Sequence, residues 1–148
     1  MEQVIRFYRA RDEKYGCFSN FSRHSVMLKG LEWSTSEHYY QAQKFANTPY
    51  EDVIRCLPRA MDAAMMGRDK SLPLRPDWEQ VKDDVMRDVV LAKFSQHEAL
   101  QEILLGTGKT AIVEASPYDS YWGEGKDGEG KNRLGVVLME VLDILSRK

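Results

Sequence analysis

The stretch "DWEQVKDDVMRDVVLAKF", residues 77–94, has the hydrophobic pattern of one long helix. Its apolar side chains recur three, four and seven positions apart, at Trp78, Val81, Val85, Met86, Val89, Val90, Ala92 and Phe94. This spacing places them along one face of an α-helix, where they can pack against the rest of the chain. We therefore expect residues 77–94 to form the longest helix.

Shorter segments on both sides of this helix predict further helices and a few strands. Alternation of apolar and polar residues favours strands, and Gly and Pro residues divide the periodic segments from one another. The expected elements are, in chain order, a strand over 4–10, a hairpin over 26–33 with its turn at Lys29 and Gly30, helices over 34–45, 48–57 and 59–67, the long helix, a helix over 98–106, a strand over 110–116, a glycine-rich loop over 116–132 and a helix over 133–148. We expect Thr48 to cap the second helix, with Glu51 completing a capping box.

These elements, with no repeat or linker between them, predict one α+β domain over residues 1–148. Helices dominate it, and the N-terminal strands join residues 110–116 in a small β-sheet. A chain of 148 residues, 43% of them hydrophobic, can bury a core without metal or disulfide support. Cys17 and Cys56 lack zinc-ligand spacing, so we expect two reduced thiols.

Charge and hydropathy argue against several classes of protein. The 21 Lys and Arg residues against 23 Asp and Glu residues give a formal net charge of -2, with no long run of either sign. A broad nucleic-acid surface is therefore not expected, although local groups can still bind a small anion. The N-terminus lacks the apolar core of a signal peptide, and no stretch reaches the roughly 18 apolar residues of a membrane span. We expect a cytoplasmic protein that is a monomer or a weak oligomer.

Three glycine patterns resemble nucleotide-binding motifs without having their context. "GEGKDG" (123–128) matches GxGxxG but follows no apolar strand, and "GKDGEGKN" (125–132) has Asn132 where a P-loop has the hydroxyl that holds magnesium. "GTGKT" (106–110) follows a helix and precedes a strand, which is the reverse of the P-loop order. We interpret these segments as turns.

The loop over residues 116–132 nevertheless has the character of a binding site. It ends at the start of the last helix with Asn132 as the expected N-cap, and free N–H groups at a helix N-terminus favour a phosphate or carboxylate. It also carries Tyr118, Tyr121 and Trp122. Solvated loops rarely hold three large aromatic side chains, so we expect an aromatic base or ring to cover them; an exposed surface turn is the alternative.

The helix over 34–45, "STSEHYYQAQKF", carries an unusual number of hydrogen-bonding side chains. Glu37, Gln41 and Lys44 share one face, and Tyr40 adjoins it. The expected N-cap is Ser34, Thr35 or Ser36. A solvated face is one interpretation of the polar side chains, and a capping box from Ser34 to Glu37 is another. In the functional interpretation the helix dipole keeps Glu37 ionised, which argues against a general acid and suits a carboxylate that binds sugar hydroxyls or activates water.

Several motifs in a fixed order resemble the YbiA-like, or NADAR, N-glycosidase family. They are "FSNFS", "EWSTSEHYYQAQKF", "LRPDW", "LAKF", "YDSYWGEGKDGEGKNRLG" and "LM", and they extend from about residue 5 to residue 139. The combination of W-x-x-x-EHYYQ-x-x-KF with D-x-x-WG-x-G-x-x-G-x-G-x-N-x-LG is highly specific. Residues 47–73 and those beyond 139 match least well.

The resemblance implies a helix-dominated α+β fold and hydrolysis of an N-glycosidic bond between a base-like amine and a ribose that carries phosphate. Phosphoribosyl intermediates of riboflavin synthesis are one substrate class of the family, and ADP-ribosylated guanine is another. The family pattern implies catalytic roles for Glu37, Lys44 and Asp119. It also implies substrate contacts, which we assign to Asn20, His38, Gln41, Trp78, Trp122, Gly123 and Asn132. For His38, a satisfied and partly buried imidazole is the alternative.

Cleavage of an N-glycoside develops positive charge on the sugar, which a nearby carboxylate stabilises. We expect one of Glu37 and Asp119 to stabilise this cation and the other to direct water, with no assignment between them. A Schiff base between Lys44 and C1 is a second route, and neither route needs a metal or a cofactor. A non-catalytic module that binds ADP-ribose or a nucleotide, and a phosphotransferase dependent on Lys131, are the rival functions.

Overall fold

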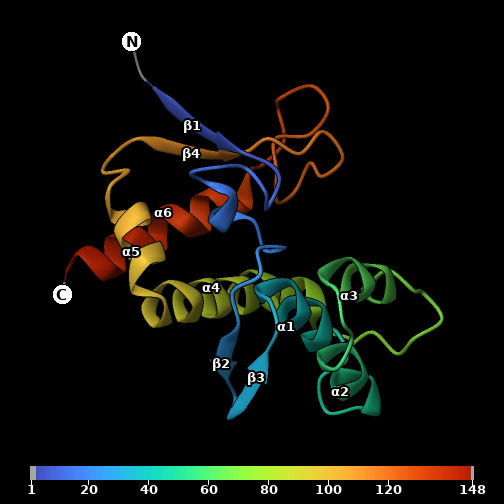
Figure 1. Cartoon of the computed structure of the whole chain (residues 1–148). Helices are drawn as coiled ribbons and strands as arrows, with labels where there is room; N and C mark the ends of the chain where they lie inside the picture. Colours follow the sequence, from blue (N-terminus) through green and yellow to red (C-terminus); the bar gives the residue numbers. More distant parts are fainter. Residues whose placement is uncertain (1–2, 148) are drawn as a thin grey trace.

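Helix α4 runs through the middle of the molecule, and other helices pack on both sides of it (Figure 1). The computed structural model describes residues 3–147. Its helices and strands are β1 (Val4–Phe7), a 3-10 helix η1 (Gly16–Phe18), β2 (Val26–Leu28), β3 (Leu31–Trp33), α1 (Ser36–Gln43), α2 (Pro49–Arg55), α3 (Ala60–Gly67), α4 (Trp78–Gln96), α5 (Glu98–Leu105), β4 (Ala111–Glu114) and α6 (Arg133–Ser146). The α+β fold dominated by helices is as predicted.

The apolar face predicted for residues 77–94 is the face that α4 buries. Val89, Val90 and Phe94 are each at most 1% exposed. The helix packs against α6 on one side and α1 on the other. Burial of each such side chain stabilises the fold by about 1.5–3 kcal/mol, so α4 makes a large contribution to the core.

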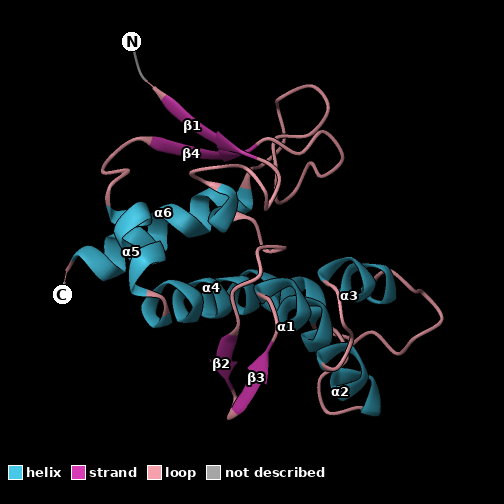
Figure 2. Ribbon diagram, in the orientation of Figure 1, coloured by secondary structure: helices cyan, strands magenta, loops and turns pink. Residues whose placement is uncertain are grey.

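The strands form two separate pairs, which corrects the prediction of one small sheet. Strand β1 pairs with β4 in parallel, whereas β2 and β3 form an antiparallel hairpin. Figure 2 shows the two pairs on opposite sides of the helices. Strand β4 packs on α6 and β2 packs on α4, so these two helices separate the pairs. The hairpin turn is as predicted, since Lys29 and Gly30 have φ angles of 56° and 73°.

Close backbone approach explains how α6 is held against β4. A Cβ atom added at Gly135 in α6 would collide with the carbonyl oxygen of Ile112 in β4. Any larger residue would push the helix away from the strand. The fold therefore requires glycine at this position, and the contact holds α6 against β4, which leads into the loop over residues 116–132.

Strand β1 ends at Phe7, earlier than the predicted residue 10, because a side chain takes the next backbone amides. The Oδ2 atom of Asp12 accepts hydrogen bonds from the N–H groups of Tyr8 and Arg9 at 3.1 and 3.0 Å. These two amides are therefore lost to the ladder with β4, and the chain turns away there. Tyr8 and Arg9 lie at the beginning of this turn.

The cap of α2 is partly as predicted. Thr48 accepts a hydrogen bond from the N–H of Tyr50, which confirms it as the N-cap. Glu51 does not complete a capping box, because its carboxylate accepts from the N–H of Asn47 and from the side chains of Gln43 and Lys29. It thus links α2 to α1 and to the hairpin.

Within residues 3–147, no helix combines the length and the apolar character that a membrane crossing requires.

Candidate active site

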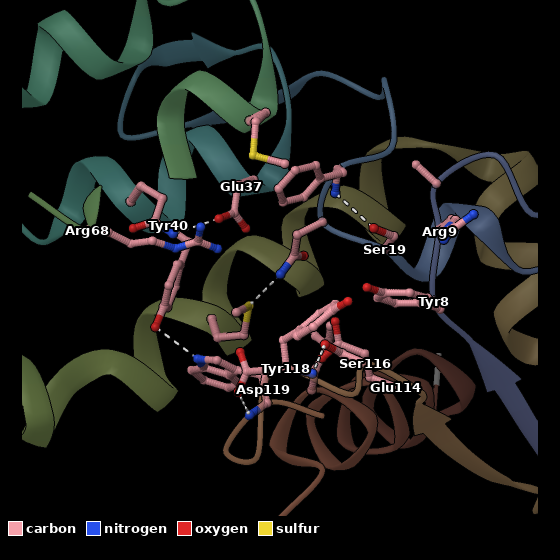
Figure 3. Close-up of a pocket in the computed structure, with 18 of the residues that line it drawn as sticks. Tyr8, Arg9, Ser19, Glu37, Tyr40, Arg68, Glu114, Ser116, Tyr118 and Asp119 are labelled. Atoms are coloured by element: carbon pink, nitrogen blue, oxygen red, sulfur yellow. Dashed lines mark hydrogen bonds between the residues drawn. The ribbon is translucent and has the colours of Figure 1, made fainter. Parts of the chain in front are cut away.

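A cleft of about 1010 Å³ opens between α1 and the segments that follow β1 and β4 (Figure 3). Its lining residues include Glu37, Tyr40, Gln41 and Lys44 from α1 and Glu114, Ser116, Tyr118, Asp119 and Trp122 from the end of β4 and the glycine-rich loop. In Figure 3 Glu37 lies across the cleft from Glu114, Ser116 and Asp119. The two motif regions that the sequence singles out, far apart along the chain, therefore form opposite walls of one cavity.

Helix α1 is buried along its whole length, which excludes the interpretation of a solvated polar face. Its N-cap is Thr35, whose hydroxyl accepts a hydrogen bond from the N–H of His38 at 3.1 Å. Ser34 does not cap the helix, so the predicted capping box from Ser34 to Glu37 is wrong. The Glu37 carboxylate is left to face the cleft.

Glu37 occupies a buried position with several partners. The Nε2 atom of Gln41 donates a hydrogen bond to its Oε2 atom at 2.6 Å. Burial raises the pKa of Glu37, and the Gln41 bond and the charges of Lys44 and Arg68 counteract this rise. The sequence-based argument from the helix dipole missed burial, which is the largest influence on this carboxyl.

Lys44 lies at the end of α1 and is held beside two aromatic rings. Its Nζ atom donates to the carbonyl oxygen of Gly67 at 3.1 Å and lies 5.8 and 5.9 Å from the ring centroids of Tyr40 and Trp78. Burial lowers the pKa of Lys44, whereas the charge of Glu37 raises it. A lowered pKa increases the fraction of neutral amine, which is the nucleophilic form.

The opposite wall is built around Asp119. Its Oδ1 atom accepts hydrogen bonds from the N–H groups of Tyr121 and Trp122 at 2.9 and 2.8 Å, which orders this part of the loop. The indole N–H of Trp122 in turn donates to the Tyr40 hydroxyl at 3.0 Å. This bond ties the loop to α1, so the two walls are held at a fixed separation.

Two of the three loop aromatics are covered by the protein itself. Tyr121 donates from its hydroxyl to Asp83 at 2.5 Å, and Trp122 packs edge-to-face against Tyr40. The expectation that a ligand covers all three is therefore wrong. Tyr118, which lines the cleft, remains 89% exposed.

The expected anion site at the start of α6 is absent from the described part of the chain. The N–H groups of residues 131–134 donate to the carbonyl oxygens of Ser120, Gly123, Tyr121 and Trp122, respectively. Asn132 adopts a left-handed conformation and makes no side-chain cap. Its side chain instead accepts from the N–H of Glu114 and donates to the carbonyl oxygen of Ile112. A phosphate cannot use amides that are already occupied.

The cleft contains six of the ten candidate residues and not the other four. Those that line it are Asn20, Glu37, Gln41, Lys44, Asp119 and Trp122, and those outside it are His38, Trp78, Gly123 and Asn132. His38 is fully buried and its ring bonds Thr35 and the Leu57 carbonyl. Trp78 packs behind Tyr40, edge-to-face. These positions hold the walls rather than face the cavity.

Sequence reasoning missed several residues that line the cleft. Arg9, Arg11 and Arg68 lie outside the motifs. Arg9 is in the strand predicted over 4–10, Arg11 follows that strand, and Arg68 follows the helix predicted over 59–67. Glu114 looked like an ordinary residue of a strand, although it ends a parallel strand, where ligands often bind. Burial raises the pKa of Glu114 to about 8, and Asp119 and Glu37 add to the rise.

No group of three or more His, Cys, Asp or Glu side chains within residues 3–147 is arranged to hold a metal ion.

Comparison with known proteins gives consistent results. The NADAR domain model matches residues 6–146. The N-glycosidase YbiA of Escherichia coli (strain K12) is 48% identical over 145 residues, which cover 98% of this chain and 90% of YbiA. The NMR structure of E. coli YbiA superposes with a TM-score of 0.90 and covers 99% of this chain and 87% of that one.

Two further relatives extend the comparison. An N-glycosidase of Nostoc punctiforme is 45% identical over 141 residues, which cover 93% of this chain and 90% of the relative. A riboflavin biosynthesis protein of Vibrio vulnificus is 41% identical over 145 residues, which cover 98% of this chain but 39% of that longer protein.

Proposed function

Since the chain belongs to the NADAR domain family, we propose that it is an N-glycosidase whose substrate is a ribosylamine 5′-phosphate with a pyrimidine-like base as leaving group. The observation that carries this proposal is one cleft in which Glu37 and Asp119 lie on opposite walls, together with arginines. The riboflavin biosynthesis name of the Vibrio vulnificus relative supports the choice of base.

The arginines supply the charge that a sugar phosphate needs. Arg9, Arg11 and Arg68 line the cleft, and none of them forms a salt bridge with any residue between positions 3 and 147. Seven other arginines are paired with carboxylates. A guanidinium group binds phosphate with two parallel hydrogen bonds, so these unpaired arginines replace the helix amides as the phosphate site.

Glu37 and Asp119 have different roles in the reaction at the sugar. Glu37 is the more buried, at 8% exposed, and Gln41 fixes its orientation. A fixed carboxylate in a site of low dielectric stabilises the positive charge that develops at C1. Asp119 uses its Oδ1 atom for the loop amides, so its Oδ2 atom is the group that accepts a proton from the attacking water.

The leaving base is placed between the walls near Tyr118 and Trp122. Tyr118 exposes its ring at the cleft, where a planar base can stack on it. Asn20 lines the same cleft and is fixed by the Ser36 hydroxyl, which donates to its Oδ1 atom at 2.9 Å. It is suited to a ribose hydroxyl.

Lys44 offers a second route to the same products. A ribosylamine that opens its ring presents C1 to a neutral amine, and burial favours that form of Lys44. Borohydride added during turnover then gives a covalent adduct in the parent protein but not in Lys44→Ala. Absence of an adduct during active turnover would exclude this route and leave direct attack by water.

A second candidate substrate is ADP-ribosylated guanine. At about 1010 Å³ the cleft lies at the upper end of ligand pockets, and its arginines come from two walls, which suits a diphosphate. The same two carboxylates would act on C1, so the chemistry is unchanged.

One experiment tests the function and distinguishes the two substrates. The protein is incubated with a ribosylaminopyrimidine 5′-phosphate, with ADP-ribosylated guanine and with NAD, and released base is measured by mass spectrometry. We expect release from the first, and a loss of at least 100-fold in Glu37→Gln. Release from ADP-ribosylated guanine alone would select the second substrate, and no release from any, despite tight product binding, would indicate a binding module.

A further inference from the structure

Glu114 is held rigidly at the end of β4, in the wall of the cleft that contains Asp119. Its backbone N–H donates to the Oδ1 atom of Asn132 at 2.9 Å, and its carbonyl oxygen accepts from the N–H of Glu124 at 2.9 Å. Strand β1 fixes it from the other side, because Glu114 is in register with Phe7. The side chain therefore projects from a fixed backbone.

The carboxyl group of Glu114 has no partner among the residues that the structure describes. Its Oε2 atom is buried and makes no hydrogen bond, and no lysine or arginine within residues 3–147 forms a salt bridge with it. Glu37, in contrast, has the Gln41 amide and the charges of Lys44 and Arg68. An ionised Glu114 would thus place negative charge on a buried oxygen that no hydrogen bond compensates.

Neighbouring charges also favour the protonated form. The charged groups that act on Glu114 are the carboxylates of Asp119, from the loop, and Glu37, from α1. Together with burial they raise the pKa of Glu114 to about 8. Carboxyl groups that share a site without enough cations do not all ionise, and the one without partners keeps its proton.

We propose that Glu114 is the general acid of the reaction, which donates its proton to the leaving nitrogen. This rests on the proposed N-glycosidase function. As the C1–N bond breaks, its electron pair goes to the nitrogen, and the proton moves from the Glu114 carboxyl to that nitrogen. The oxygen of water bonds to C1, and one of its protons passes to Asp119.

The exchange is balanced, since one water is consumed and the products are a neutral amine and a ribose with a hydroxyl at C1. Glu114 ends as a carboxylate and Asp119 as an acid, and proton exchange with solvent resets both. Without a donor the base would have to leave as an unstable amide anion. The Glu114 carboxyl is thus the proton donor to the leaving group, a role for which the sequence alone indicated no residue.

The protonation of Glu114 can be measured without substrate. The glutamate carboxyl carbons are labelled with ¹³C and titrated by NMR in the parent protein, in Glu114→Gln and in Glu129→Gln, a control at an exposed position of the loop over residues 116–132. We expect one resonance with a midpoint near 8 that is missing in Glu114→Gln and present in Glu129→Gln. A Glu114 midpoint near the ordinary value of about 4.3 would overturn the proposal.

Kinetics then test the role. Glu114→Gln is nearly isosteric, and we expect kcat to fall about 10²- to 10⁴-fold with little change in KM, together with loss of the alkaline limb of the pH profile. An unchanged rate or pH profile in Glu114→Gln would overturn the proposal. Failure of the parent protein to release base would instead contradict the N-glycosidase function, while the titration still reports the state of Glu114.

Discussion

The substitution Gly67→Ala tests how closely the catalytic carboxylate depends on its neighbour. Gly67 ends α3 and lies against the Gln41 side chain in α1. A Cβ atom added there would lie 2.6 Å from Cδ of Gln41 and 3.1 Å from its Cβ, and closer still to Oε1. The Gln41 amide must therefore swing away, which breaks the 2.6 Å hydrogen bond from its Nε2 atom to Glu37.

The expected effect is larger on activity than on stability. Loss of one hydrogen bond to a charged group costs about 1.5–3 kcal/mol. Replacement of glycine by alanine at the end of a helix raises the free energy of unfolding by about 0.5–1 kcal/mol, because the unfolded chain has less conformational entropy. The net loss of about 1–2 kcal/mol leaves the protein folded. Misplacement of the Glu37 carboxylate by about 1 Å is expected to lower kcat by about 10²-fold.

The assay compares base release and thermal unfolding in Gly67→Ala with those in Gly106→Ala. Gly106 follows α5, lies outside the cleft, and its nearest neighbour to an added Cβ is a backbone oxygen at 3.2 Å. It should keep full activity. In a Gln41→Ala background the clashing amide and the bond are both gone and only the Cβ contact at 3.1 Å remains, so Gly67→Ala should have little further effect on kcat. Full activity of Gly67→Ala alone would refute the role assigned to the bond from Gln41 to Glu37.

Three further predictions concern the buried polar groups. The pKa of Glu114 is about 8 in the folded chain and near 4.5 in the unfolded chain. Between these pH values the native state keeps a proton that the unfolded state loses, so the free energy of unfolding falls as pH rises from about 4.5 to 8. Urea unfolding should therefore show Glu114→Gln gaining stability relative to the parent protein between pH 5 and pH 8.5, and an equal difference at both pH values would argue against the raised pKa. Tyr40→Phe leaves the indole N–H of Trp122 without its acceptor, and calorimetry should show a loss of about 1–3 kcal/mol, whereas an unchanged Tm would mean that this bond does not hold the two walls together. Lys93→Met removes hydrogen bonds from the Lys93 Nζ atom to oxygen atoms of Cys17, Ser19 and Ser22. We expect thermal unfolding to show a loss of stability of about 3 kcal/mol or more, and kinetics to show a raised KM, because Asn20 lies in the same segment. A stable variant with normal KM would contradict this.

Local patterns predicted the elements because each depends on near neighbours. The spacing of Val85, Val89 and Phe94 is a property of one helix, and the turn at Lys29 and Gly30 is a property of two residues. Such signals need no knowledge of the rest of the chain. The pairing of strands is different, since no local pattern says whether the hairpin joins β1 or packs on another face of the helices.

The wrong predictions at the site have a similar cause, because they depend on hydrogen bonds and charges from residues distant in sequence. The sequence leaves Ser34, Thr35 and Ser36 as alternative N-caps of α1, and the structure selects Thr35 over the capping box of Ser34 with Glu37. The sequence shows free amides at the start of α6, but not that the carbonyl oxygens of the preceding loop accept from them. Glu114 carries no local signal, because its unusual environment comes from α1 and from the loop.

Base release in a single turnover, measured for Glu37→Gln, Asp119→Asn and the double variant, tests most directly whether the two walls act on one sugar. Both variants should bind the ribosylaminopyrimidine 5′-phosphate within a few-fold of the parent protein but release base at least 100-fold more slowly. The double variant should lose much less than the product of the two effects, since the carboxylates act on the same transition state. Full rates in either single variant, or strictly multiplicative losses in the double variant, would contradict a shared site.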